Sequence, residues 1–216
     1  VTPSIALAPR LKAMASCTLG RDASRHDLLS GAREIGLSGG LAYSRSRRFR
    51  VRLGVERRRL AYDQTALAGA QGGDVFPAGF TRVDRQTGFR ASAQSYRGGL
   101  LDIVYRFVTN DSNSFGYGYS SHHFRLLYAH AFPWDLEAQA YLNLQARQYS
   151  ESVPLASFTR PEVDEYEQTS LVLKASRAVS RRLGVSARYG YFRNGSVAEG
   201  GFYRKQVISI SVETHL

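Results

Sequence analysis

Two adjacent histidines, His122 and His123, directly follow two serines, Ser120 and Ser121, with Asp111 earlier in the same region. A serine beside a histidine can act as a nucleophile with its general base. If this stretch is a strand, neighbouring side chains point to opposite faces, so Ser121 shares a face with His123 and Ser120 with His122. No third member of a triad is evident. We therefore predict no catalytic residue, and we interpret the four as polar side chains at the end of a strand.

Metal and redox chemistry find little support in the sequence. Cys17 is the single cysteine, so neither an internal disulfide nor a thiolate metal cluster can form. The segments 110–113 and 22–27 are acidic enough to suggest calcium, but they lack EF-hand spacing, and turn chemistry is the simpler interpretation. No phosphate-binding glycine loop or dinucleotide fingerprint occurs. We predict no metal and no cofactor.

The chain has 216 residues and a formal net charge of +11, and its basic residues are almost all arginine. Strong basicity suggests nucleic acid, but no basic helix, zinc ligand set or RNA-binding motif accompanies it, so we predict no nucleic-acid partner. A membrane-spanning helix needs about 20 consecutive apolar residues, whereas the apolar runs here are only a few residues long. The start at Val1 lacks the features of a signal peptide. An exported protein would therefore be numbered from after cleavage or from inside a longer chain.

The elements that position these side chains are predicted by a period of two. In residues 136–147 apolar and polar side chains alternate strictly, whereas a helix would scatter both sets around its axis. Comparable alternation predicts ten strands, near residues 4–18, 35–43, 49–56, 82–96, 101–107, 119–128, 136–147, 168–176, 183–191 and 208–216. The alternation slips near residues 57–60, where we expect a bulge or the point at which the strand leaves the membrane. Residues 63–79 are rich in Gly, Ala and Gln and are expected to form a long loop.

The connections between these strands alternate between long loops and short turns, which is typical of an outer-membrane barrel. We therefore predict an all-β fold, a single antiparallel up-and-down transmembrane β-barrel of about ten strands. It occupies residues 1–216 as one domain of a porin-like membrane protein in the outer membrane of a Gram-negative bacterium, with both termini on the periplasmic, short-turn side.

The two faces of the predicted wall differ in character. The inward, polar face carries a mesh of charges, formed by Arg10, Lys12, Glu34, Arg50, Arg52, Glu56, Asp84, Arg90, Asp102, Arg106, Arg125, Glu137, Arg147, Lys174 and Arg188. The outward face is apolar, with an aromatic girdle at the lipid boundary formed by Tyr43, Phe49, Tyr96, Tyr105, Phe107, Tyr128, Phe132, Trp134, Tyr189 and Tyr191. The charge mesh has two interpretations: a plug of salt bridges that fills the lumen, or a narrow anion-preferring channel, because basic residues outnumber acidic ones.

One stretch of the chain occurs twice. Residues 105–128, a strand, an Asn-Asp-Ser-Asn loop and a second strand, match residues 189–212 without a gap, which indicates one structural unit used twice. These units resemble Gram-negative outer-membrane barrels that follow tetratricopeptide repeats and act in surface-lipoprotein or exopolysaccharide export. The resemblance covers residues 100–216. It departs from that family because no helical repeat precedes the barrel, those barrels generally have more strands, and Leu216 replaces the usual terminal Phe.

From these observations we expect a non-enzymatic barrel that anchors or scaffolds a cell-envelope assembly. The alternatives are a narrow anion-preferring channel or export conduit, for polysaccharide or surface protein, and an outer-membrane lipid hydrolase. The expected partners are outer-membrane lipid, lipopolysaccharide and other envelope proteins.

Overall fold

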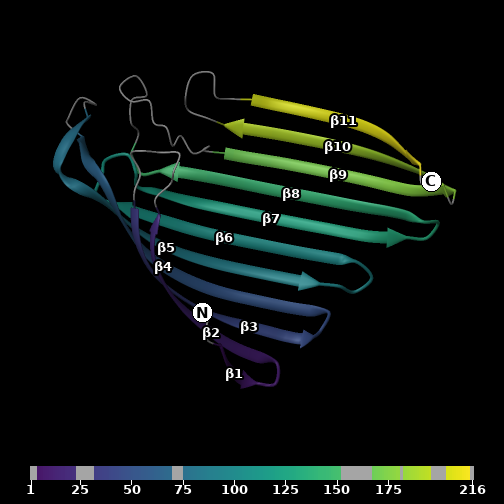
Figure 1. Cartoon of the computed structure of the whole chain (residues 1–216), viewed down its shortest axis with the longest axis horizontal. Coiled ribbons are helices and arrows are strands. Elements are labelled where there is room, and N and C mark those ends of the chain that lie inside the picture. The colour runs from purple at the N-terminus through teal and green to yellow at the C-terminus, as the bar shows by residue number, and fades with distance from the viewer. Residues whose placement is uncertain are drawn as a thin grey trace.

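The computed structural model describes residues 4–22, 32–69, 75–151, 167–180, 182–195 and 203–214, and all of its regular elements are strands of one sheet. Each strand pairs antiparallel with its neighbours in sequence (Figure 1). The strands are β1 (Ser4–Ala8), β2 (Leu11–Asp22), β3 (Ala32–Ser46), β4 (Phe49–Gly69), β5 (Val75–Ser95), β6 (Leu100–Ser112), β7 (Tyr119–Phe132), β8 (Leu136–Tyr149), β9 (Glu167–Ser180), β10 (Leu183–Gly195) and β11 (Tyr203–Thr214). This confirms the predicted all-β, antiparallel, up-and-down architecture of about ten strands. In the ranges described, no helix is long and apolar enough to cross a membrane.

The eleventh strand arises because the first predicted strand is divided. Ala8 pairs with Leu11 across a tight turn, so residues 4–18 form β1 and part of β2 instead of one strand. Proline has no backbone N–H to donate to a ladder, which explains a break at Pro9. Arg10 therefore lies in a turn and not within a strand, and its carbonyl oxygen accepts a hydrogen bond from the Ser44 amide at 2.8 Å.

The prediction of a loop over residues 63–79 is wrong, because β4 runs to Gly69 and β5 begins at Val75. The bulge is also displaced. The β4–β5 register is unbroken from Phe49 to Ala61, and it shifts between Ala61 and Thr65. The sequence pattern misplaced the bulge because arginines occupy both faces of β4 at residues 57–59. Charge on both faces removes the hydropathy alternation without interrupting the strand.

Short turns gather at one end of the sheet, at residues 47–48, 96–99 and 133–135, and the strand ends that are joined by longer stretches of sequence lie at the other end (Figure 1). Trp134 and Asp135 both have positive φ, 66° and 55°, which closes the β7–β8 turn in the left-handed region. We call these two ends the turn side and the loop side. β11 ends on the turn side. β1 runs toward the turn side and reaches it at the turn to β2, so its first residue, Ser4, lies further along the wall, between the turn side and the loop side. The periplasmic location of the termini stays a prediction.

The repeated unit has the same register in both copies. Asn110 is the partner of Tyr119 in the β6–β7 pair, and Asn194 is the partner of Tyr203 in the β10–β11 pair. Both asparagines are buried, at 4% and 6% exposed. The match found in the sequence therefore corresponds to two hairpins of equal geometry, both of which place an asparagine on the same face at the loop side.

The described sheet has two free edges. Within the described ranges β1 pairs with β2 alone and β11 with β10 alone, and all twelve residues of β11 are exposed. Figure 1 shows these two strands at opposite sides of a curved wall.

Candidate functional site

The outward face of the wall is apolar and uncovered. Val55 is 60% exposed and Ile208 is 77% exposed, and other aliphatic residues of the same face are similarly open. Soluble monomers rarely expose contiguous apolar patches larger than a few hundred Å². Because this face alternates with a polar one along every strand, the arrangement is that of a wall whose outer side contacts lipid.

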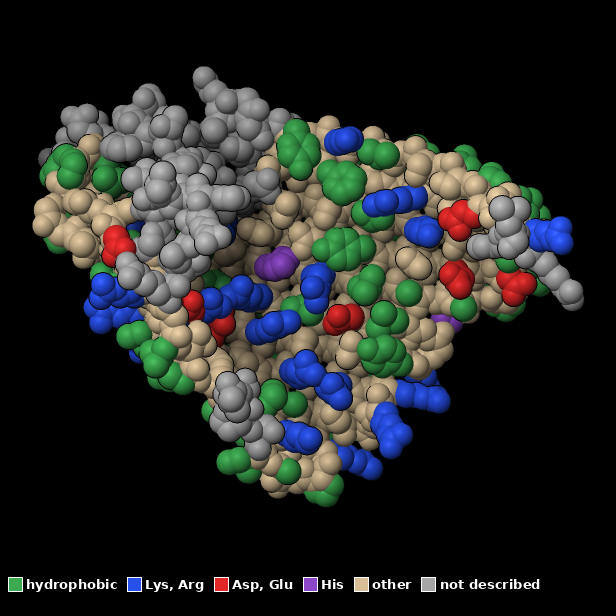
Figure 2. All heavy atoms as spheres, in the orientation of Figure 1, with side chains coloured by type: hydrophobic (Ala, Val, Ile, Leu, Met, Phe, Trp, Pro, Cys, Tyr) green, Lys and Arg blue, Asp and Glu red, His purple; other side chains and the backbone are tan. Residues whose placement is uncertain are grey.

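The opposite face is hollowed and rich in basic side chains. Figure 2 shows Lys and Arg side chains spread through the middle of this face, with fewer Asp and Glu side chains among them. Cross-strand register places most of the predicted charge mesh on it, namely Lys12, Glu34, Arg50, Arg52, Glu56, Asp84, Arg90, Asp102, Arg106, Arg125, Glu137, Arg147, Lys174 and Arg188. Arg10 is the one member of the predicted mesh that this register does not place, because it lies in the turn between β1 and β2.

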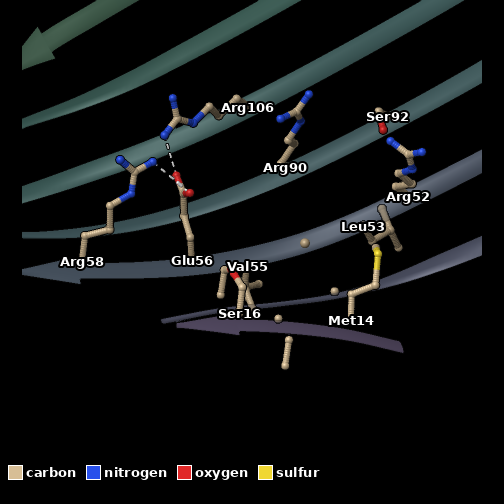
Figure 3. Close-up of a pocket in the computed structure, with 15 residues that line it drawn as sticks. Met14, Ser16, Arg52, Leu53, Val55, Glu56, Arg58, Arg90, Ser92 and Arg106 are labelled. Carbon is tan, nitrogen blue, oxygen red and sulfur yellow. Dashed lines mark hydrogen bonds and ion pairs between the residues drawn. The ribbon is translucent and has the colours of Figure 1, made fainter. Parts of the chain in front are cut away.

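The centre of the hollow is an arginine cluster on β4, β5 and β6, shown in Figure 3. Glu56 accepts a hydrogen bond from Arg58 at 3.0 Å and another from Arg106 at 2.5 Å. Arg90 lies directly opposite Arg106 in the β5–β6 register. Like charges placed opposite one another on a sheet repel. Glu56 offsets this repulsion at Arg106 but leaves the charge on Arg90.

A second part of the hollow continues toward the turn side. Arg50, Arg52 and Arg90 line it together with Asp102 and Arg125. The Asp102 carboxylate lies 3.7 Å from Arg125. No ion pair to another described residue is found for Arg50, Arg52 or Arg90, so this stretch of wall keeps an excess of positive charge. We call Arg50, Arg52 and Arg90 the arginine ladder.

Sequence reasoning missed two inward arginines. Arg58 was overlooked because it falls where the alternation slips, although its position two residues after Glu56 on a continuous strand could have revealed it. It also approaches Glu34 at 3.7 Å. Arg82 was overlooked because it precedes the alternating part of β5, next to residues expected to form a loop.

Arg82 and Asp84 form a buried ion pair at the loop side. The Asp84 side chain is 1% exposed and Arg82 is 7% exposed, with 2.6 Å between a terminal nitrogen and Oδ2. Ser112 Oγ donates to Asp84 Oδ1 at 2.6 Å, and the Arg82 guanidinium lies over the Tyr117 ring at 3.6 Å. Asp84 was expected to be part of a charge mesh in the lumen. It faces the hollow, where its bond to Ser112 joins the end of β6 to β5, and Arg82 contacts Tyr117 of the β6–β7 connection.

The predicted loop motif at residues 110–113 contributes to the same attachment. Asn113 Oδ1 accepts from the Val83 amide at 2.7 Å, and its Nδ2 donates to the Thr81 carbonyl at 3.0 Å. Ser114 Oγ accepts from the Leu67 amide at 2.9 Å. These three bonds reach across to β4 and β5, whereas the bond from the Ser114 amide to Ser112 Oγ, at 3.1 Å, is the local turn bond of the kind that the sequence favoured. Residues 110–112 belong to β6, so the expected loop begins only after them. Among the described residues, no three His, Cys, Asp or Glu side chains gather as metal ligands.

The serine–histidine stretch lies on β7, and the expected division between faces is confirmed. Ser121 and His123 face the hollow, and Ser121 is 8% exposed. The His123 Nε2 atom lies 2.5 Å from Asn143 Oδ1 on β8. His122 faces outward, where its Nδ1 is 2.8 Å from the Tyr105 hydroxyl. The sequence did not identify Asn143 as a partner, because it belongs to another strand.

Strand register places eight of the ten predicted girdle residues on the outward face, at two levels, and the other two, Tyr96 and Trp134, lie in turns. Near the turn side, Phe49, Phe132 and Trp134 are 36%, 40% and 79% exposed. Toward the loop side, the Phe107 ring lies 4.8 Å from the His122 ring, between ring centroids. The remaining predicted members are Tyr43, Tyr96, Tyr105, Tyr128, Tyr189 and Tyr191. Cys17 is also exposed, and the β2–β3 register places it on the outward face.

These features define a class. A sheet of long antiparallel strands with an apolar outer face, a polar hollowed face and connections sorted by length is the wall of an outer-membrane-type β-barrel.

Two solved structures resemble this fold at low similarity. The chain superimposes on "OmpT (in-vitro folded), an outer membrane protein of Vibrio cholerae", with a TM-score of 0.47 and 13% identity, over 98% of this chain and 60% of that one. It also superimposes on LpxR from Salmonella typhimurium, with a TM-score of 0.37 and 8% identity, over 98% of this chain and 86% of that one. The chain thus spans about 60% of the length of the first structure. At this level of similarity neither match assigns an activity. No family model and no curated protein matches the sequence.

One expectation is corrected here. The sequence analysis inferred from the barrel pattern that the protein is not an enzyme, but a fold does not determine function, and enzymes and non-enzymes are built on the same folds. The pattern of a barrel wall therefore does not exclude catalysis. The resemblance to barrels that follow tetratricopeptide repeats has no counterpart in the two structures.

Proposed function

We propose that the hollowed face lines an aqueous pore that prefers anions. The observation that carries this proposal is the arginine ladder, whose three guanidinium groups face the hollow without a carboxylate partner among the described residues. Fixed charges of one sign on a low-dielectric wall concentrate mobile ions of the opposite sign. Rings of arginine and lysine are the usual means of selecting anions in pores.

The neighbours of the ladder support a water-filled lumen over a plugged one. Ser92 and Gln94 line the same part of the hollow, and Arg52 and Arg90 are exposed. A plug of salt bridges would pair most of these charges. The pairs that do occur, Glu56 with Arg58 and Arg106 and Asp102 with Arg125, leave the ladder unneutralised.

Planar-bilayer recordings of the full chain test this proposal. In a salt gradient the wild type should give stable channels with a reversal potential displaced toward the anion, and Arg52→Gln/Arg90→Gln should move that potential toward zero. Arg59→Gln/Arg85→Gln removes the same charge from the outward face and is the matched control, so it should leave the potential unchanged. Cation preference in the wild type, or an equal effect of the control, would reject the anion pore. A folded but non-conducting barrel would also reject it, and would favour the envelope scaffold.

Lipid hydrolysis is the second candidate, and the hydrogen bond between His123 and Asn143 favours it. With Asn143 Oδ1 as the acceptor, His123 Nε2 carries the hydrogen, which leaves Nδ1 as the basic nitrogen. Ser121 lies two residues earlier on the same face, at a Cα separation of about 7 Å. This places a hydroxyl and an oriented base in one part of the hollow, as nucleophilic catalysis requires.

Release of fatty acid from outer-membrane glycolipid by the folded chain tests this candidate. Ser121→Ala and His123→Ala should each abolish release, whereas Ser120→Ala and His122→Ala, on the outward face, should retain it. If the wild type releases no fatty acid, or if the outward pair matters as much as the inward pair, catalysis at Ser121 and His123 is excluded.

A further inference from the structure

We propose that four outward-facing arginines at the loop side bind the phosphate groups of a phosphorylated glycolipid in the outer leaflet. Arg33 on β3, Arg57 and Arg59 on β4, and Arg85 on β5 make up this outer arginine patch. All four are exposed. The inference goes beyond the pore, because the patch lies on the opposite face from the arginine ladder.

Strand register brings the patch together. Arg59 is the direct partner of Arg85 across the β4–β5 pair and of Ile35 across the β3–β4 pair. Arg57 lies on the same face two residues earlier, beside Leu37 and Thr87. Three neighbouring strands thus present guanidinium groups at nearly one level of the wall.

The charge of the patch is only partly balanced by carboxylates of the residues that the structure describes. The Cβ atoms of directly opposite residues are about 4.5–5.5 Å apart, and like charges at that separation destabilise a sheet. Asp111 is the described carboxylate nearest to the patch in register, at 3.9 Å from Arg85. The two side chains are 65% and 79% exposed, so their attraction is screened by water. An anion from outside the chain would relieve the repulsion between Arg59 and Arg85.

A phosphate group suits this arrangement better than a carboxylate or a halide. The planar guanidinium offers parallel N–H donors that match two phosphate oxygens. Several arginines on adjacent strands can contact one phosphate monoester from different sides, or two phosphates on one headgroup.

The apolar surface below the patch indicates that the anion belongs to a lipid. Val55 lies next to Arg57 on the outward face of β4, two residues closer to the turn side, and it is 60% exposed. Its partner across the strand pair, Phe89, is 38% exposed, and Phe107 continues the row on β6. A soluble anion would use the arginines alone. A glycolipid with its phosphates on the patch and acyl chains against Val55 and Phe89 would use both surfaces.

The position of the patch selects the leaflet. It lies at the loop side, which in outer-membrane barrels is the extracellular side. The outer leaflet there supplies phosphorylated glycolipid, and this agrees with the lipopolysaccharide partner expected from the sequence.

Binding of lipid A to the full chain, folded in uncharged detergent, tests the proposal. The probes are lipid A and the same lipid with its phosphates removed enzymatically, and retained lipid is counted by native mass spectrometry. Wild type should retain lipid A and lose most retention when the phosphates are removed. Arg57→Gln/Arg59→Gln/Arg85→Gln should weaken lipid A binding by about tenfold or more, since loss of a charge-assisted hydrogen bond changes affinity by about that factor.

The matched control is Arg50→Gln/Arg52→Gln/Arg90→Gln, which removes the same charge from the inward face and should leave lipid A binding unchanged. Equal retention of the two lipids by the wild type, or equal losses in both variants, would overturn the proposal. Displacement of lipid A by inorganic phosphate at equal concentration would overturn the role of the apolar surface. If the triple variant of the patch does not fold, the comparison of lipid A with its dephosphorylated form on the wild type still tests whether the phosphate groups are needed for binding.

Discussion

Removal of the buried carboxylate at the loop side should release the β6–β7 connection from β5. Asp84→Ala leaves Arg82, which is 7% exposed, without its ion-pair partner, and also takes the acceptor from Ser112. The strands of the membrane wall below should keep their pairing, because their register does not depend on this pair. The expected result is a local detachment of the β6–β7 connection from β4 and β5.

The magnitude follows from the burial of the pair. Breaking a buried ion pair by removing one partner costs about 3–5 kcal/mol, because the remaining charge is left without compensation. The matched control is Asp111→Ala, since the Asp111–Arg85 pair joins β5 to β6, as the Asp84–Ser112 bond does, but is 65–79% exposed at 3.9 Å. An exposed pair contributes at most about 1 kcal/mol. The two substitutions should therefore differ by more than about 2 kcal/mol.

Hydrogen exchange at two amides measures this difference. The Val83 amide donates to Asn113 Oδ1, and the Leu67 amide donates to Ser114 Oγ, so both report whether the connection is attached. Exchange at both should accelerate by about 100-fold or more in Asp84→Ala, and by less than about tenfold in Asp111→Ala. Arg82→Met/Asp84→Leu, which removes both charges, should restore part of the protection. Equal exchange rates in the two single variants, or no recovery in the double variant, would show that the pair does not hold the connection.

Two further substitutions test other contacts of the wall. Gly40→Ala should lower the yield of folded, heat-modifiable barrel, because the new Cβ would lie 2.6 Å from the Leu53 carbonyl oxygen. Gly39→Ala should fold normally, because the atom nearest to its new Cβ is 3.9 Å away, and similar yields of the two variants would refute the close approach of β3 and β4 as the cause. Asn113→Ala should destabilise the β6–β7 connection by about 1–3 kcal/mol through the loss of its bonds to Val83 and Thr81, and resistance to limited proteolysis equal to that of the wild type would contradict this.

The fold was predictable because, along most strands of the wall, apolar residues occupy alternate positions and point to one face, while polar residues occupy the positions between them and point to the other face. Residues 136–147 form a strand as expected, and the repeat at residues 105 and 189 corresponds to two hairpins of equal register. The prediction failed where hydropathy does not follow the backbone. Arg57 and Arg59 place charge on the outward face of a regular strand, and small residues after Ala61 continue β4 by pairing with β5.

The site was only partly predictable for a related reason. Parity assigns a side chain to a face, so Arg52, Arg90 and Arg106 could be placed inward from the sequence. Parity does not give the register between strands, and the register decides that Arg90 faces Arg106 and that His123 meets Asn143. The contact between Arg82 and Asp84 lies within one strand and follows from parity, but it was unforeseen because Arg82 stands next to residues that were expected to form a loop.

The direction of the two edge strands limits how this wall can close. Because neighbours alternate in direction along the order β1 to β11, the first and last strands run the same way. Joining them directly would create a parallel pair in an otherwise antiparallel sheet. An uninterrupted antiparallel cylinder requires an odd number of additional strands between these edges, from the same polypeptide or from a partner, and the total is then even. Unpaired backbone groups cannot persist in hydrocarbon, so the edge of β11 has to be paired when the protein is in a bilayer.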